Sequence, residues 1–297
     1  MKRRTFIGTS AAASVGMLAA QTGNATPFRS GDAMTSSENS PLKLKNNINH
    51  SACFWCYNPI PLDEFLGNLN DLGVKAIDLV GPEDWPLLKK HGIHASMCWG
   101  AGLGIEKGWN DPKLHTELIQ DYQRVIPLVA EAGYTNLICF SGNRNGLDDE
   151  IGLQNCVEGL KQVLPDAEKH GVVLQMELLN SKVNHPDYMC DHTLWGVELC
   201  KQLGSENFKL LYDIYHMQIM EGDVIRNIQD YHQYFGHYHT GGNPGRHEID
   251  ETQELFYPAI MKAIVETGFK GHVAQEFVPS WDDKIAALKQ GVTICDV

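Results

Sequence analysis

The chain has 297 residues, of which 43% are hydrophobic and 21% charged, a composition ordinary for a globular protein. Its formal net charge is −13. A surface this acidic repels phosphate backbones, which argues against nucleic acid as the main partner. About 250 residues remain once an atypical N-terminus is set aside, which is the size of one α/β barrel.

The N-terminus has the layout of an export signal. Lys2, Arg3 and Arg4 precede a mildly apolar run over residues 6–20, and small residues follow. This order is typical of secretory signals, and adjacent arginines specify the twin-arginine type. The alternatives are a disordered basic tail and an amphipathic anchor. The run is too short and too rich in Ala, Ser and Gly to span a bilayer, which needs about 20 apolar residues.

The sequence therefore predicts three segments. Residues 1–25 form a twin-arginine signal, residues 26–47 a polar linker, and residues 48–297 a catalytic domain. The signal predicts a periplasmic protein with no stable membrane anchor after cleavage. Cys53 and Cys56 have redox-motif spacing but lie along an expected strand, which disfavours a redox role and leaves a disulfide open.

After the linker, short apolar runs alternate with longer helical stretches. Most of the short runs are apolar on both faces, as expected for parallel strands covered by helices. They are residues 48–55, 75–81, 94–100, 136–142, 172–180, 208–216, 235–242 and 272–277. The expected helices are residues 61–72, a stretch ending before Gly92, and residues 111–132, 147–170, 192–203, 223–233, 252–267 and 281–294.

Eight strands alternating with eight helices predict a (β/α)8 TIM barrel rather than an open sheet. An open doubly wound sheet would be expected to carry a glycine-rich phosphate loop early. Neither GxGxxG nor GxxxxGK follows the first expected strand. The glycine-rich loop over residues 101–104 matches neither pattern and is expected at the barrel mouth.

Ionisable residues stand in apolar runs at four consecutive expected strand ends. They are Glu177, Asp213, the pair His237 and His239, and Glu276. For any one of these residues, a salt bridge to a single partner would explain the burial of a charge. All four strand ends converge in a barrel, however, so we expect these side chains to lie together. Three carboxylates together repel one another, and a divalent cation resolves that repulsion.

The ligand set does not identify the metal. Carboxylates with one imidazole suit Mn²⁺, Mg²⁺, Co²⁺ or Zn²⁺, and we expect Mn²⁺. His237 and His239 point to the same side of their strand, so the alternation of side chains does not choose between them.

Four strings around these residues resemble the xylose isomerase-like barrel superfamily of sugar isomerases and epimerases. The strings are MELLN, YDIYHMQ, HYHTGGNPGRHEID and AQEFVP. The resemblance runs from about residue 48 to the end, is sharpest from Glu177 onward, and is closest to hydroxypyruvate isomerases. It implies one metal ion held by Glu177, Asp213, His239 and Glu276. It also implies that Glu177 and Glu276 exchange protons with the substrate through a metal-stabilised enediolate.

Two further residues match substrate contacts of that superfamily. His216 matches a histidine that contacts a substrate oxygen, although a helix-start histidine is an alternative. Arg246 matches an arginine that holds the substrate at the mouth of the site. Val183 stands where ketose epimerases carry another glutamate, and His239 stands where hydroxypyruvate isomerases commonly carry glutamine.

The leading hypothesis is an isomerase or epimerase of a small hydroxy-carbonyl compound or sugar, with homo-oligomerisation left open. A lyase or dehydratase acting on a keto-sugar or inosose would begin with the same proton abstraction. Phosphodiester hydrolysis is disfavoured because it would need more ligands and a basic groove. A non-catalytic periplasmic sugar-binding protein is a further alternative, with Trp55, Trp99 and Trp109 available for stacking.

Overall fold

The computed structural model describes residues 42–297. The predicted signal over residues 1–25 and the linker as far as residue 41 lie outside the described residues. Eight parallel strands follow in chain order. They are β1 (Asn49–Ala52), β2 (Ala76–Val80), β3 (His94–Cys98), β4 (Asn136–Cys139), β5 (Val173–Glu177), β6 (Phe208–Asp213), β7 (Phe235–Thr240) and β8 (His272–Gln275).

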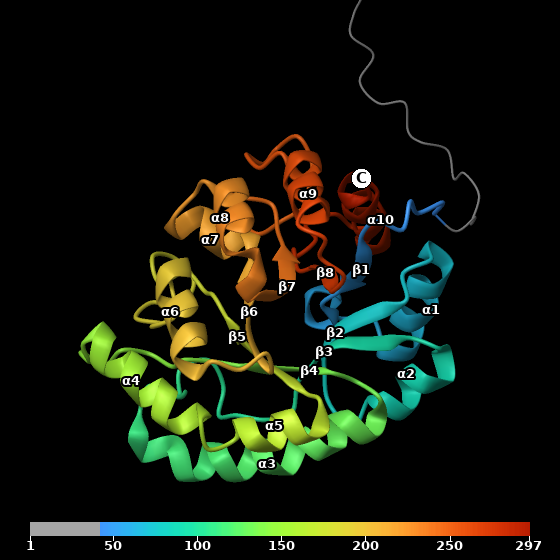
Figure 1. Ribbon diagram of the computed structural model, residues 1–297. Coiled ribbons are helices and arrows are strands. Elements are labelled where there is room, and N and C mark those ends of the chain that lie inside the picture. The colour runs from blue at the N-terminus through green and yellow to red at the C-terminus, as the bar shows by residue number, and fades with distance from the viewer. Residues whose placement is uncertain (1–41) are drawn as a thin grey trace, which may run out of the picture. The chain divides into compact units, whose positions relative to one another are not determined.

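The strands form one sheet in the order β1-β8-β7-β6-β5-β4-β3-β2. β1 pairs with β8 from Asn49–His272 to Ala52–Gln275. A parallel bridge between Cys53 and Asp78 joins the end of β1 to β2 and brings the two sheet edges together. The result is a near-closed ring of strands with helices outside it (Figure 1), which confirms the predicted TIM barrel.

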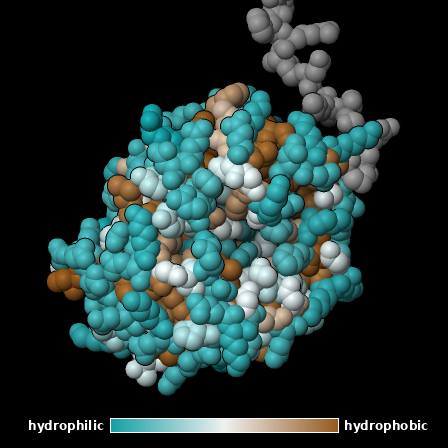
Figure 2. Space-filling model, viewed as in Figure 1, coloured by the Kyte–Doolittle hydropathy of each residue, from teal (hydrophilic) through white to brown (hydrophobic). Residues whose placement is uncertain are grey.

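The helices alternate with the strands along the chain. They are α1 (Leu62–Leu72), α2 (Trp85–His91), α3 (His115–Ala132), α4 (Asp149–Leu160), α5 (Leu164–His170), α6 (Thr193–Leu203), α7 (Ile214–Met220), α8 (Val224–Tyr231), α9 (Tyr257–Glu266) and α10 (Lys284–Cys295). Short 3-10 turns lie at Phe54–Tyr57, Pro112–Leu114 and His232–Tyr234. The surface in Figure 2 is mostly hydrophilic with smaller hydrophobic patches, as expected for the outer faces of such helices.

Several predicted elements are wrong in their bounds. The strand over residues 172–180 ends at Glu177, and the helix over residues 252–267 begins at Tyr257. The expected helix over residues 147–170 is divided into α4 and α5, because Pro165 in the first turn of α5 has no N–H to continue the earlier helix. The first strand ends at Ala52, before a 3-10 turn. The sixth ends at Asp213 rather than residue 216, because the Asp213 side chain caps α7.

The buried interior contains one tryptophan and two cysteines for which the sequence analysis suggested other roles. Trp109 was expected near a strand end where it could stack on a sugar, but it is fully buried and packs against Tyr122. Cys53 and Cys56 are buried free thiols, as are the other cysteines in the described residues. Within residues 42–297, no helix is both long and apolar enough to cross a membrane.

Candidate active site

Four ionisable side chains from consecutive strand ends meet at the carboxyl end of the barrel. Glu177 ends β5, Asp213 ends β6, His239 lies in β7, and Glu276 directly follows β8. Asp213 and His239 are partners in the β6–β7 register, which places their side chains side by side. Each of the four is at most 4% exposed, and one ligand atom from each lies within 4.8 Å of the others.

The imidazole of His239 faces all three carboxylates. Its Nδ1 lies 2.6 Å from Glu276 Oε2, 3.4 Å from Glu177 Oε1 and 4.0 Å from Asp213 Oδ2. Both Nδ1 and Glu276 Oε2 are buried and make no aligned hydrogen bond within the described residues. Glu276 Oε2 also lies 2.6 Å from Arg246 Nη2, so the fit to a common cation comes from the convergence of the four ligand atoms. One imidazole nitrogen with three carboxylate oxygens suits Mn²⁺, Mg²⁺, Co²⁺ or Zn²⁺.

Burial and neighbouring charges separate the pKa values of the three carboxyl groups. Burial raises the pKa of Asp213 to about 8 and also raises the pKa of Glu177. Burial acts in the same direction on Glu276, but Arg246 and His239 outweigh it and lower the pKa of that carboxyl well below its usual value. Such separation of neighbouring carboxyl groups is typical of functional sites.

Asp213 has two tasks that its position at a strand–helix junction allows. Its Oδ1 accepts a hydrogen bond of 3.0 Å from the His216 backbone N–H, which caps the start of α7. Its Oδ2 faces the carboxylate cluster and lies 3.4 Å from Arg246 Nη2. The cap therefore fixes both the beginning of α7 and the direction in which Asp213 Oδ2 points.

His216 lies in the first turn of α7 and is fully buried beside the cluster. Its Nδ1 accepts a hydrogen bond of 2.6 Å from Asn180 Nδ2. The proton of a neutral ring therefore resides on Nε2, which lies 3.7 Å from Asp213 Oδ2 and makes no hydrogen bond within the described chain. Burial and the charge of Arg246 lower the pKa of His216 well below its usual value, so it offers a neutral N–H donor.

Arg246 reaches from the loop after β7 to the floor of the site. Its backbone has φ +60°, an uncommon conformation for a residue with a side chain. The guanidinium Nη2 lies 2.6 Å from Glu276 Oε2, and the group stacks between Trp55 and Tyr215 at 5.3 and 5.4 Å. Arg246 was expected at the mouth; the structure places its guanidinium deeper, against the carboxylates.

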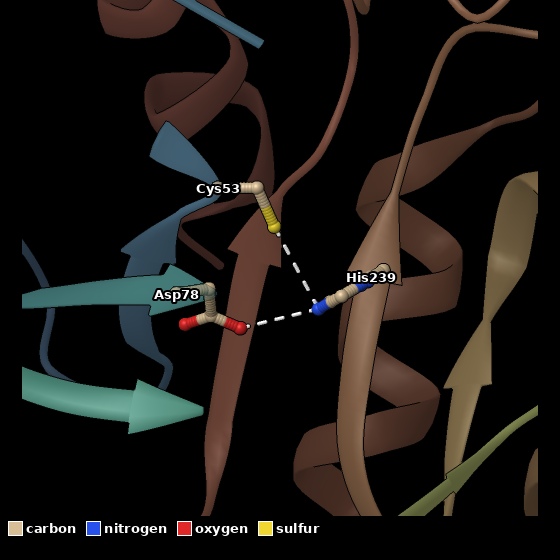
Figure 3. A group of neighbouring side chains, drawn as sticks. All are labelled: Cys53, Asp78 and His239. Atoms are coloured by element: carbon tan, nitrogen blue, oxygen red, sulfur yellow. Dashed lines mark hydrogen bonds and ion pairs between the residues drawn. The ribbon is translucent and has the colours of Figure 1, made fainter. Parts of the chain in front are cut away.

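A second buried network lies directly behind His239, and sequence reasoning did not single it out (Figure 3). Asp78 from β2 points toward His239, whose Nε2 lies 3.1 Å from Asp78 Oδ2 and 3.7 Å from Cys53 Sγ. The same Oδ2 lies 2.5 Å from His237 Nε2. The other carboxylate oxygen accepts hydrogen bonds from two buried serines, Ser51 and Ser96.

This network separates the two histidines of β7. Asp78 carries only acceptors when ionised, so it favours a proton on Nε2 of His239 and leaves Nδ1 free to face the carboxylates. His237 contacts the same Asp78 oxygen but is not one of the four clustered residues. Asp78 stands in the apolar run KAIDLVG, so the criterion that identified the four strand-end residues would also have identified it.

A cavity of about 380 Å³ opens over the cluster. Glu177, Arg246 and Glu276 form its polar floor. Trp55 donates a hydrogen bond of 2.9 Å from Nε1 to Glu276 Oε1, so it braces this glutamate while lining the cavity. The other lining residues are Leu79, Trp99, Ile105, Ile138, Phe140, Leu179 and His185.

The fold is a TIM barrel with four potential metal ligands at the carboxyl ends of its strands, and comparison with known proteins agrees with this fold. Residues 85–293 match the family described as xylose isomerase-like TIM barrel. The chain belongs to that family.

Several named proteins are similar to the chain at low identity. A putative hydroxypyruvate isomerase from Mus musculus is 28% identical over 262 residues, covering 82% of this chain and 91% of the mouse protein. A putative hydroxypyruvate isomerase from Homo sapiens is 29% identical over 126 residues, or 42% of this chain and 46% of that protein. A 2-oxo-tetronate isomerase from Cupriavidus necator is 32% identical over 123 residues, or 41% and 46%. The chain thus spans about half the length of the human and Cupriavidus relatives.

Solved structures show the same fold. An AP endonuclease, family 2, from Brucella melitensis has a TM-score of 0.74 and 24% identity, covering 82% of this chain and 97% of that chain. A 3-keto-D-glucoside 4-epimerase from E. coli has a TM-score of 0.70 and 15% identity, covering 84% and 98%.

Proposed function

We propose that this protein is a metal-dependent isomerase or epimerase of a sugar or small hydroxy-carbonyl compound. The observation that carries the proposal is the meeting of Glu177, Asp213, His239 and Glu276 at the floor of an open cavity. The names of the relatives, hydroxypyruvate isomerase and 2-oxo-tetronate isomerase, support an isomerase on a hydroxy-carbonyl substrate.

The chemistry required is the removal and return of a proton next to a carbonyl. A divalent ion held by the four residues would supply a Lewis acid that stabilises negative charge on the substrate oxygens. Glu177 and Glu276 line the floor of the cavity and act as the proton-transfer pair. One glutamate takes the proton from a substrate carbon. The other delivers a proton to the neighbouring carbon in an isomerisation, or to the opposite face of the same carbon in an epimerisation.

Two further side chains orient the substrate. His216 presents an Nε2–H that has no other hydrogen-bond acceptor in the described chain, and it donates to a substrate hydroxyl or carbonyl oxygen. Arg246 keeps Glu276 ionised and offers its remaining N–H groups to the substrate. The asymmetry in the surroundings of Glu177 and Glu276 suits a pair in which one donates while the other accepts.

Product analysis tests this proposal. The purified protein is incubated with Mn²⁺ and a panel of hydroxypyruvate, 2-keto acids bearing a 3-hydroxyl, free ketoses and 3-keto-glucosides, and the products are identified by NMR. We expect an isomer or epimer of at least one compound, formed with Mn²⁺ and not with excess chelator. A dehydrated product would show that the protein is a lyase rather than an isomerase. Binding without turnover would favour the sugar-binding alternative.

We further propose that the protein is exported to the periplasm by the twin-arginine route. The support is the sequence alone, Lys2-Arg3-Arg4 followed by residues 6–20. Fusion of residues 1–41 to a reporter, compared with the same fusion carrying Arg3→Lys and Arg4→Lys, tests it. Export of the first and retention of the second is expected, and equal export of both would contradict it.

A further inference from the structure

The cavity is polar only at its base. Glu177, Arg246 and Glu276 hold the reacting end of a substrate, and His185 is the one further ionisable residue in its lining within the described chain. The remaining lining, called the upper wall, is mainly apolar and comes from β2, β4 and the segments that follow several strands: Trp55, Leu79, Trp99, Ile105, Ile138, Phe140 and Leu179. The site is therefore divided into a polar floor and an apolar upper wall.

Two polar side chains near the site, Asn180 and Tyr215, make hydrogen bonds to other protein groups. The Asn180 amide contacts His216 and Asn184, and its oxygen accepts from the Val183 backbone. The Tyr215 hydroxyl donates to Asn184. Away from His185 and the polar floor, a substrate hydroxyl placed against the apolar side chains of these walls would lose water without gaining a protein partner, which costs on the order of 1–3 kcal/mol.

Leu79 gives independent support. Its φ is +61°, a left-handed conformation that is strained for a leucine. The β2–β3 register shifts on both sides of the preceding residue, Asp78, and Leu79 lies within the second shift, between Asp78 and Val80. Irregularities of this kind redirect side chains next to functional sites, and here the redirected leucine lines the cavity.

We propose that the substrate carries an apolar substituent beyond its hydroxy-carbonyl carbons, and that the upper wall binds it. This inference rests on the proposed function for the reacting end. The class of substrate is a keto-sugar joined to an alkyl or aryl group, rather than a free short-chain keto acid or an unsubstituted ketose. A cavity of about 380 Å³ is larger than a three-carbon acid would fill and lies within the range of ordinary small-molecule sites.

The test compares two ligands that differ only in the substituent. The methyl and phenyl β-glycosides of 3-keto-D-glucose are titrated into the Mn²⁺-loaded full chain by calorimetry. We expect the phenyl glycoside to bind about 10- to 100-fold more tightly, as burial of one additional apolar group in a fitted pocket allows. Trp99→Ala and Leu79→Gly should each reduce that ratio. Trp281→Ala is the matched control, because Trp281 is a partly exposed tryptophan that does not line the cavity.

The experiment distinguishes failure of the substituent proposal from failure of the proposed proton transfer. Equal affinity for the two glycosides, no measurable binding of either, or an unchanged ratio in both Trp99→Ala and Leu79→Gly would overturn the substituent proposal. Solvent proton exchange is measured on the same ligands. A strong preference for the phenyl glycoside with no exchange would keep the apolar subsite and count against the proposed proton transfer.

Discussion

Replacing Asp78 with asparagine tests how the buried network behind His239 prepares it as a metal ligand. Asp78 Oδ2 lies 3.1 Å from His239 Nε2, and its other oxygen accepts from Ser51 and Ser96. An asparagine has two arrangements there. If its NH₂ faces His239, the ring must move its proton to Nδ1 and loses its lone pair for the metal. If its oxygen faces His239, the negative charge is lost.

Partners of this kind typically change metal affinity by 10- to 100-fold, which corresponds to about 1.4 to 2.8 kcal/mol. We expect a loss within that range for Asp78→Asn, measured as the Mn²⁺ dissociation constant from the free-ion EPR signal. Ser51→Ala is the control, since it removes a donor to Oδ1 and leaves the contact with His239, and its loss should be much smaller. Near-UV circular dichroism verifies that both variants are folded. Wild-type affinity in folded Asp78→Asn, or an equal loss in Ser51→Ala, would refute the reasoning.

Three other outcomes follow from the structure. Mn²⁺ at one hundred times its dissociation constant should stabilise the protein by about 2.7 kcal/mol, roughly 5 to 10 °C in melting temperature, and an equal rise in Glu177→Gln would contradict the ligand set. Gly159→Ala should lower the free energy of unfolding by about 1–3 kcal/mol in urea titrations, because a Cβ there lies 2.7 Å from Trp109. Gly67→Ala has open space around its Cβ and should not lower the free energy of unfolding. Equal losses in the two variants would count against the packing argument. Burial lowers the pKa of His272 to about 4, so the unfolded chain binds the extra proton first as the pH falls. Stability should therefore decrease by about 2 kcal/mol between pH 7 and 5 from this group, and His272→Gln should show a smaller decrease; an identical decrease would reject the assignment.

The barrel was predictable because most of its strands are apolar on both faces and several of its helices end at glycines. Gly73, Gly92, Gly133 and Gly171 have left-handed φ values directly after α1, α2, α3 and α5, which marks the helix ends in the sequence. The errors arose where local chemistry overrides periodicity. The cap by Asp213 starts a helix inside an apolar run that reads as strand, and Pro165 divides a continuous helical pattern.

The cluster of strand-end residues was predictable because a barrel makes its strand ends converge. The alternation of side chains did not choose between His237 and His239, and the family resemblance chose His239. In the structure both histidines contact Asp78, and His239 is the one whose Nδ1 faces Glu276. The depth of Arg246 was beyond sequence reasoning. Its position depends on a left-handed backbone in the loop after β7 and on stacking between two aromatic rings, one from the 3-10 turn after β1 and one from α7.

Deuterium uptake from solvent tests the central claim most directly. Substrate identified by product analysis is incubated in D₂O with Mn²⁺ and the wild-type protein, Glu177→Gln or Glu276→Gln, and the label on the carbon next to the carbonyl is followed by NMR. We expect metal-dependent uptake by the wild type and its loss in both variants, each of which still binds the substrate. Uptake at the wild-type rate in either variant, with Mn²⁺ bound, would contradict proton transfer by this pair of glutamates.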